Sequence, residues 1–180
     1  MIRNVVLYGN PILRKISEPV SNIKDHTELI SDLKENLLYH SGLGLAAPQI
    51  WENVRIISIL SEDGEPVIYI NPKIIYLSKE TVVDEEGCLS FPDIFGNILR
   101  AIKVRVKALD ENGNEIEIEA KDYYARAFQH EIDHLDGKLF IDRLSYASKK
   151  YLKKEIEAIR KMGANQIKEF QRGDAVDSND

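Results

Sequence analysis

The segment Gln129-His130-Glu131-Ile132-Asp133-His134 places two histidines four residues apart. On an α-helix this spacing directs both side chains from one face, about one turn apart, where they can bind a single metal ion. Glu131 would then be placed to accept a proton from water at that metal, which predicts hydrolytic chemistry. The alternative is a helix whose two histidines are simply solvated, since a motif this short also arises by chance.

The flanking residues indicate a helix from about Asp122 to Asp136. Apolar side chains recur along it, at Ala125, Ala127, Phe128, Ile132 and Leu135. Asp122 is a candidate N-terminal cap, and Gly137 follows the last apolar residue, where helices often end. This context favours the metal-binding interpretation of the motif.

Periodic patterns elsewhere predict two more helices and several strands. The helices are expected over residues 25–40 and from about 146 to 162, and the strands over residues 54–60, 66–71, 73–77, 103–109 and 115–120. Asn112-Gly113, between the last two strands, is a strong hairpin signal. We therefore expect an α+β fold, in which mostly antiparallel strands form small sheets around the central helix that carries the His-Glu-x-x-His motif. One helix in the N-terminal half and one at the C-terminus complete it.

Length and composition predict a single domain. Residues 1–171 are expected to form it, including the helix from about residue 146, and residues 172–180 are expected to be a disordered tail. The net charge of −6 and the pI of about 5.3 argue against general nucleic-acid or membrane-surface binding. No apolar run reaches the roughly 20 residues of a transmembrane helix, and the first apolar run is too short for a signal peptide. We expect a cytoplasmic protein.

Cys88 is the only cysteine, so an intramolecular disulfide is excluded. A lone intracellular cysteine is usually a small buried apolar residue. Here the preceding residues are Asp84-Glu85-Glu86-Gly87, which suit core packing poorly. A thiolate bound to a cation fits this setting better, and Cys88 is therefore a candidate third metal ligand. One thiolate and two neutral imidazoles around a divalent ion carry a net charge of about +1 and leave a position open for water.

Two further features bear on the metal hypothesis. The segment Gly42-Leu43-Gly44-Leu45-Ala46-Ala47-Pro48-Gln49 is rich in small residues, which would let the backbone of a bound peptide approach closely. Its alternative interpretation is a tightly packed turn. Glu86 can pair with Arg100 and so hold the cysteine segment in place, although two unrelated surface charges are the other interpretation.

Together, three segments resemble the motifs of the peptide deformylases. Gly42 to Gln49 is similar to the first motif, Glu86-Gly87-Cys88-Leu89-Ser90 to the second, and Gln129 to His134 to the third, in that order along the chain. The resemblance extends from Gly9 to Leu144. Three motifs at matching separations are far more specific than any one of them.

This resemblance implies a metal-dependent hydrolase that removes the N-terminal formyl group from formylmethionine of nascent polypeptides and releases formate. It implies three metal ligands, Cys88, His130 and His134. Glu131 would be the general acid/base while metal-bound water attacks the formyl carbon. The side-chain amide of Gln49 and the backbone N–H of Leu89 would stabilise the oxyanion. Rival interpretations are a zinc peptidase that uses the same helix motif and a non-catalytic binding module.

Helical spacing suggests where the methionine side chain binds. Tyr123 and Arg126 lie seven and four residues before His130, on the same helix face. With Leu43 they can form a long apolar slot, to which the arginine contributes its aliphatic stem. The alternative is that both merely cover the helix surface. The backbone of Gly42 to Leu45, including Gly44, is expected to pair with the substrate as a strand does.

Phe95-Gly96 departs from the family pattern, because some relatives carry a basic residue near this position. The preference for residues after formylmethionine is therefore open. The metal is open too. Softness and geometry of the three ligands suit zinc, whereas the resemblance implies Fe2+ in the native state of many members, with Zn2+, Ni2+ or Co2+ also accommodated.

Basic residues predominate in the predicted C-terminal helix. They are Lys149, Lys150, Lys153, Lys154, Arg160 and Lys161, against the acidic Glu155 and Glu157. Most such faces are simply solvated. The resemblance offers another interpretation, because bacterial members can use a C-terminal helix to dock on the ribosome. A basic stripe would bind rRNA phosphates in a salt-sensitive way.

Overall fold

The computed structural model describes residues 1–171, with side chains as far as Ile167, so the predicted tail of residues 172–180 lies outside the described residues. One sheet has five strands in the order β1-β2-β3-β6-β7. They are β1 (Gly44–Ala46), β2 (Ile56–Leu60), β3 (Pro66–Leu77), β6 (Lys103–Leu109) and β7 (Glu115–Lys121). A second sheet is the hairpin of β4 (Thr81–Cys88) and β5 (Phe91–Ala101). Every strand pair within the two sheets is antiparallel.

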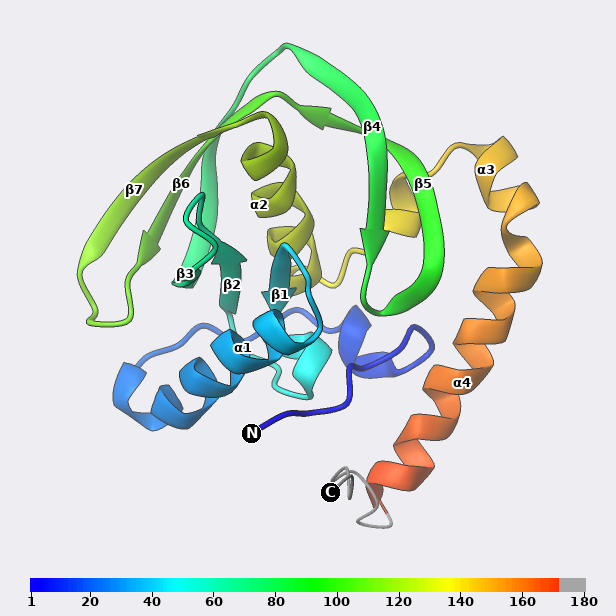
Figure 1. Ribbon diagram of the computed structural model, residues 1–180, viewed down its shortest axis with the longest axis horizontal. Coiled ribbons are helices and arrows are strands. Elements are labelled where there is room, and N and C mark those ends of the chain that lie inside the picture. The colour runs from blue at the N-terminus through cyan, green and yellow to red at the C-terminus, as the bar shows by residue number, and fades with distance from the viewer. Residues whose placement is uncertain (172–180) are drawn as a thin grey trace.

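Four α-helices complete the described part of the chain: α1 (Thr27–Tyr39), α2 (Asp122–Leu135), α3 (Tyr146–Tyr151) and α4 (Lys153–Gln171). Short 3-10 helices are η1 (Pro11–Arg14), η2 (Ile23–His26), η3 (Ala47–Ile50) and η4 (Phe140–Arg143). Figure 1 shows α2 at the centre, between the five-stranded sheet and the β4–β5 hairpin, with α4 along the outside. The predicted α+β fold around the motif helix is confirmed. Within residues 1–171, no helix has an apolar stretch sufficient to span a bilayer.

Burial explains the central place of α2. Eleven of its 14 residues are buried, and only some of them are apolar. Phe128 and Ile132 pack with Val104 and Val106 of β6, where buried and exposed side chains alternate. The opposite face buries polar groups, among them His130 and His134. Because buried polar groups require partners, this face must carry hydrogen bonds or bind a ligand.

Three sequence expectations about the elements need correction. Asp122 does not cap α2: Lys121 holds the N-cap position, and Asp122 has a φ of 50° because the chain turns directly from β7 into the helix. Residues 66–71 and 73–77 form the single strand β3, with a register irregularity between Ile70 and Lys73. The C-terminal helix is divided into α3 and α4, and α4 continues through Gly163 as far as Gln171.

An extended segment, residues 5–8, joins α4 to the middle of the molecule. Two of its backbone N–H groups donate to the carbonyls of Gln49 and Ser90, at 2.8 and 3.0 Å. Its other edge bonds to the side-chain amide of Gln166 in α4, which accepts one backbone N–H at 2.8 Å and donates to one carbonyl at 2.9 Å. Gln166 thus takes the place of a neighbouring strand.

Glycine allows α4 to lie against this segment. A Cβ added to Gly163 would lie 2.2 Å from the carbonyl oxygen of Tyr8 and 2.4 Å from that of Leu7. Real Cβ atoms do not approach backbone oxygen so closely. Any side chain at this position would therefore push α4 away from residues 7 and 8.

We expect Gly163→Ala to lower the melting temperature by several degrees, because overpacking of this kind costs about 1–3 kcal/mol. The direction of the change in melting temperature is informative, because replacing glycine by alanine in an unconstrained helix raises stability by about 1 kcal/mol. Thermal unfolding followed by circular dichroism measures the change. Asn165→Ala, at an exposed position of the same helix, is the matched control and should not lower it. A more stable Gly163→Ala protein would contradict the close packing.

Candidate metal centre

The three candidate ligands come together from two elements. Cys88 ends β4, while His130 and His134 lie one turn apart on α2. One ligand atom from each residue lies within 4.8 Å of the other two. Cys88 Sγ is 3.3 Å from His134 Nε2, and the two imidazole rings are 5.1 Å apart between centroids. Residues far apart in sequence therefore form one compact cluster.

The donor set fits a transition-metal ion. His130 Nδ1 donates to Glu86 Oε2 at 2.9 Å, which leaves the other ring nitrogen as a metal ligand. His134 presents Nε2 to Cys88, and its buried Nδ1 has no hydrogen-bond partner among the described residues. A thiolate with two imidazoles is a combination that zinc, iron, nickel and cobalt ions bind. These three residues leave positions open for water or substrate.

The surroundings of the cluster favour a cation. Burial lowers the pKa of His130, but hydrogen bonds to Cys88 and Glu86 outweigh it, so that this pKa lies well above the usual value. The groups that stabilise a proton there would equally stabilise a metal cation. Burial, with the nearby charge of His130, lowers the pKa of His134 well below its usual value. A neutral imidazole is the form that binds a metal.

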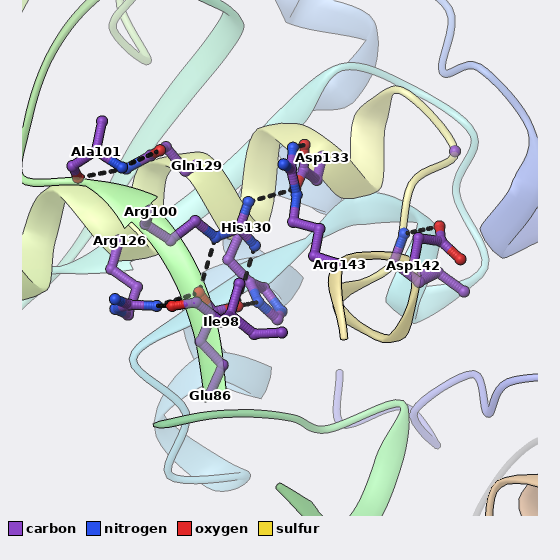
Figure 2. Close-up of polar contacts among 12 residues, drawn as sticks. Glu86, Ile98, Arg100, Ala101, Arg126, Gln129, His130, Asp133, Asp142 and Arg143 are labelled. Carbon is purple, nitrogen blue, oxygen red and sulfur yellow. Dashed lines mark hydrogen bonds and ion pairs between the residues drawn. The ribbon is translucent and has the colours of Figure 1, made fainter. Parts of the chain in front are cut away.

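Glu86 connects the two elements that carry the ligands. Arg100 of β5 donates to both oxygens of Glu86, at 2.8 and 3.0 Å (Figure 2). The structure therefore forms the ion pair between Glu86 and Arg100 that the sequence suggested. Arg126 Nη1 of α2 adds a third bond, also at 2.8 Å. Burial raises the pKa of Glu86, but hydrogen bonds from His130 and Arg100 lower it far more. Glu86 is therefore an ionised, fully paired carboxylate behind His130.

The sequence did not reveal how far this network extends. Asp133, between the two histidines on α2, accepts from Arg100 Nη1 at 2.6 Å and from two nitrogens of Arg143 at 2.7 and 2.8 Å. Asp133 is 8% exposed. Aspartate is almost never fully buried without a partner, so its place on the buried face of the helix was the available signal. Nothing in the spacing pointed to Arg143.

Gln49 lies beside the ligands. It belongs to η3, directly after β1, and its Oε1 accepts the backbone N–H of Ala46 at 2.9 Å. Its Nε2 is 3.5 Å from Cys88 Sγ and 3.2 Å from Ser90 Oγ. The amide is thereby oriented with its donor group toward the cluster. Leu89 follows Cys88 in the turn between β4 and β5 and lines the adjoining cavity.

A cavity of about 790 Å³ opens next to the cluster. Four of the residues considered for substrate binding line it, namely Leu43, Gly44, Tyr123 and Arg126. The guanidinium of Arg126 is turned toward Glu86 and the carbonyls of Ile98 and Val82, so only its stem is left to face a substrate. Such a volume suits a ligand larger than one side chain.

Leu45 does not line this cavity. Its side chain is fully buried in the core beneath α1, together with Leu37 and Ile56. Only its backbone can meet a substrate, since β1 is an edge strand of the five-stranded sheet. Sequence analysis also missed several wall residues that come from distant segments, namely Asn4, Asp93 and Gln166.

Glu131 has a carboxyl group that faces the cavity region and lacks, among the described residues, a hydrogen-bond partner for one of its oxygens, Oε2. The side chain of Glu131 is buried. Burial raises its pKa to about 7. A Cβ added to Gly44 would lie 2.5 Å from Glu131 Oε1, so glycine is what admits this carboxyl group.

Comparisons with known proteins agree with this site. The family model described as polypeptide deformylase matches residues 2–151. A peptide deformylase of Pseudothermotoga lettingae is 43% identical over 89% of this chain and 94% of its own, and one of Brachyspira hyodysenteriae is 41% identical over 93% and 94%. The crystal structure of peptide deformylase from Thermus thermophilus has a TM-score of 0.85 at 35% identity, over 90% of this chain and 99% of that one. This chain therefore belongs to the polypeptide deformylase family, whose members are metal-dependent enzymes that remove the N-formyl group from nascent polypeptides.

Proposed function

We propose that Cys88, His130 and His134 hold one divalent metal ion at which this protein deformylates nascent chains that begin with formylmethionine. The observation that carries the proposal is the convergence of a thiolate from β4 and two imidazoles from α2 beside a buried, unpartnered carboxyl group. When bound, the cation supplies Lewis-acid activation of water and of the formyl carbonyl. Residues 1–171 are proposed to act as one catalytic domain.

Glu131 is proposed as the general acid/base. A carboxyl group with a pKa of about 7 can accept a proton near neutral pH and release it again. It takes the proton that the attacking water gives up. It then passes a proton to the departing amine nitrogen, so that the products are formate and a peptide with a free N-terminus.

Gln49 and Leu89 are proposed to stabilise the oxygen on which negative charge develops. The amide nitrogen of Gln49 already lies within 3.5 Å of Cys88 Sγ, and its orientation is held by Ala46. The backbone N–H of Leu89 belongs to the residue after the cysteine. Preorganised donors of this kind need no rearrangement during the reaction.

The methionine side chain is proposed to occupy the part of the cavity between Leu43, Tyr123 and the stem of Arg126. The edge of β1, at Gly44 and Leu45, would pair with the substrate backbone, because an edge strand presents unpaired N–H and C=O groups. Glu86 and Arg100 are proposed to support the site by orienting His130.

Glu131→Ala and Gln49→Leu should each nearly abolish formate release from a formylmethionyl peptide. The first removes the proton acceptor, and the loss of one oxyanion donor costs on the order of a hundredfold in rate. Formate production at saturating substrate, with metal content measured alongside, tests both. Glu117→Ala, at an exposed position of β7, is the control. Near-normal turnover in either site variant, or cleavage of the peptide backbone, would contradict the assignment.

We propose Fe2+ as the native metal, with Zn2+, Ni2+ or Co2+ able to replace it. Protein purified without oxygen should contain iron and should be more active than the zinc-substituted form. Chelation should remove activity and lower the melting temperature, since an ion that binds only the folded chain stabilises it. Cys88→Ser should weaken this metal-dependent stabilisation. Anaerobically purified protein that contains zinc alone, at full activity, would refute iron as the native metal.

The substrate class implies a cytoplasmic location, where nascent chains emerge, and α3–α4 is proposed to dock on the ribosome. Exposed lysines are available there at positions 150, 153 and 154. Changing all three to glutamate should abolish salt-sensitive cosedimentation with ribosomes, because fewer phosphates are neutralised. These substitutions leave Gln166 in place, so turnover of free peptides should be unchanged. Undiminished cosedimentation would exclude this surface as the docking site.

A further inference from the structure

Arg143 extends the charged network behind the metal ligands to the protein surface. It lies at the end of η4, and its Nε and Nη2 donate to the two oxygens of Asp133 at 2.7 and 2.8 Å. Its side chain is 41% exposed, whereas those of Glu86 and Arg100 are 4% and 2% exposed. Figure 2 shows Arg143 and Arg100 meeting at Asp133.

Arg100 divides its donors between two carboxylates. Nε and Nη2 bind Glu86, and Nη1 binds Asp133. The position of this guanidinium therefore depends on the charge of both acids. Glu86 in turn holds the ring of His130 through Nδ1. A continuous series of charge-assisted bonds runs from Arg143 through Asp133, Arg100 and Glu86 to a metal ligand.

Loss of Arg143 would unbalance this series. Asp133 would keep only Arg100 as a partner among the described residues, and a buried carboxylate with too few partners is costly. Asp133 would then attract the guanidinium of Arg100 more strongly. The two hydrogen bonds from Arg100 to Glu86 would be weakened as a result. Glu86 would hold His130 in a less defined orientation.

We propose that Arg143 is a positioning residue for the metal centre, which acts on His130 through Asp133, Arg100 and Glu86. This inference rests on the proposed function, because the orientation of His130 matters only if it binds the metal. It concerns a residue that touches neither ligand nor substrate. We call this series of bonds, from Arg143 to His130, the relay. Through it, a residue at the surface just before α3 would influence the metal affinity of the site.

The chain offers a control ion pair whose carboxylate, Asp142, lies on the same 3-10 helix as Arg143, while its arginine, Arg14, ends η1. Arg14 binds both oxygens of Asp142, the residue before Arg143, at 2.5 and 2.9 Å. Its side chain is 39% exposed, close to the value for Arg143. Arg14→Gln thus removes a similarly exposed arginine that pairs with η4, although its partner Asp142 is more exposed than Asp133, and it leaves the relay intact.

The test compares Arg143→Gln with Arg14→Gln by the Ni2+ dissociation constant of the chelated protein, measured in competition with a metal indicator. Removing a residue behind a metal ligand weakens binding by about 10- to 100-fold, and we expect about tenfold for Arg143→Gln. Arg14→Gln should change Ni2+ affinity much less than Arg143→Gln does, since the charge of Arg14 is only the last of the influences on the pKa of His134, although both variants lower the melting temperature. The thiolate-to-metal absorption band of the Co2+ form should shift only in Arg143→Gln. Arg143→Lys, which keeps the charge but not the paired donors, should recover affinity in part.

A double-mutant cycle tests the route. If Arg143 acts through Glu86, Arg143→Gln should change Ni2+ affinity little further in a Glu86→Gln background, because coupled residues are not additive. Additive losses, or equal affinities for the two single arginine variants, would overturn the relay. Should Glu86→Gln not fold, the comparison of the two arginine variants decides alone. A wild-type protein that binds no Ni2+ and releases no formate would instead refute the proposed function.

Discussion

The ionised carboxylate of Glu86 is the constraint on which the site depends. It is buried at the end of β4, two residues before Cys88, and binds Arg100 of β5 together with Arg126 and His130 of α2. One group thereby sets the distance between the strand that supplies the thiolate and the helix that supplies the imidazoles. An isolated buried charge would destabilise the fold. The buried charge of Glu86 does so less, because two arginines and a histidine form ion pairs or hydrogen bonds with it.

Sequence patterns identified the elements whose periodicity follows from burial on one face. The alternation of β6 and the Asn-Gly turn before β7 predicted that hairpin, and the register agrees. The β4–β5 hairpin was missed because six of the eight residues of β4 are exposed, so no alternation marks it. The segment around Cys88, for which no element was predicted, is the end of a strand. Its position is set by pairing with a partner strand and not by its own side chains.

The candidate site divides in the same way. Motif spacing alone suggested His130, His134 and Glu131, because one helix turn relates them. Cys88 needed the chemical argument that acidic neighbours suit a bound cation, and Gln49 needed the family resemblance. Asp133 offered only its place on the buried face of α2, and Arg143 and the buried side chain of Leu45 were beyond reach, since each depends on which segment packs against α2 or α1. Tertiary contacts of this kind leave no local periodic signal.

Folding and metal binding must be coupled in such an arrangement. The proposed ligands lie on β4 and α2, and a metal site drawn from distant segments does not exist in the unfolded chain. The buried polar face of α2 gains little from its own ion pairs, because desolvation offsets most of their attraction. A cation that binds only the native state at the proposed site would supply stabilisation that these ion pairs do not. Folding of the chain and occupancy of the proposed site would then support each other.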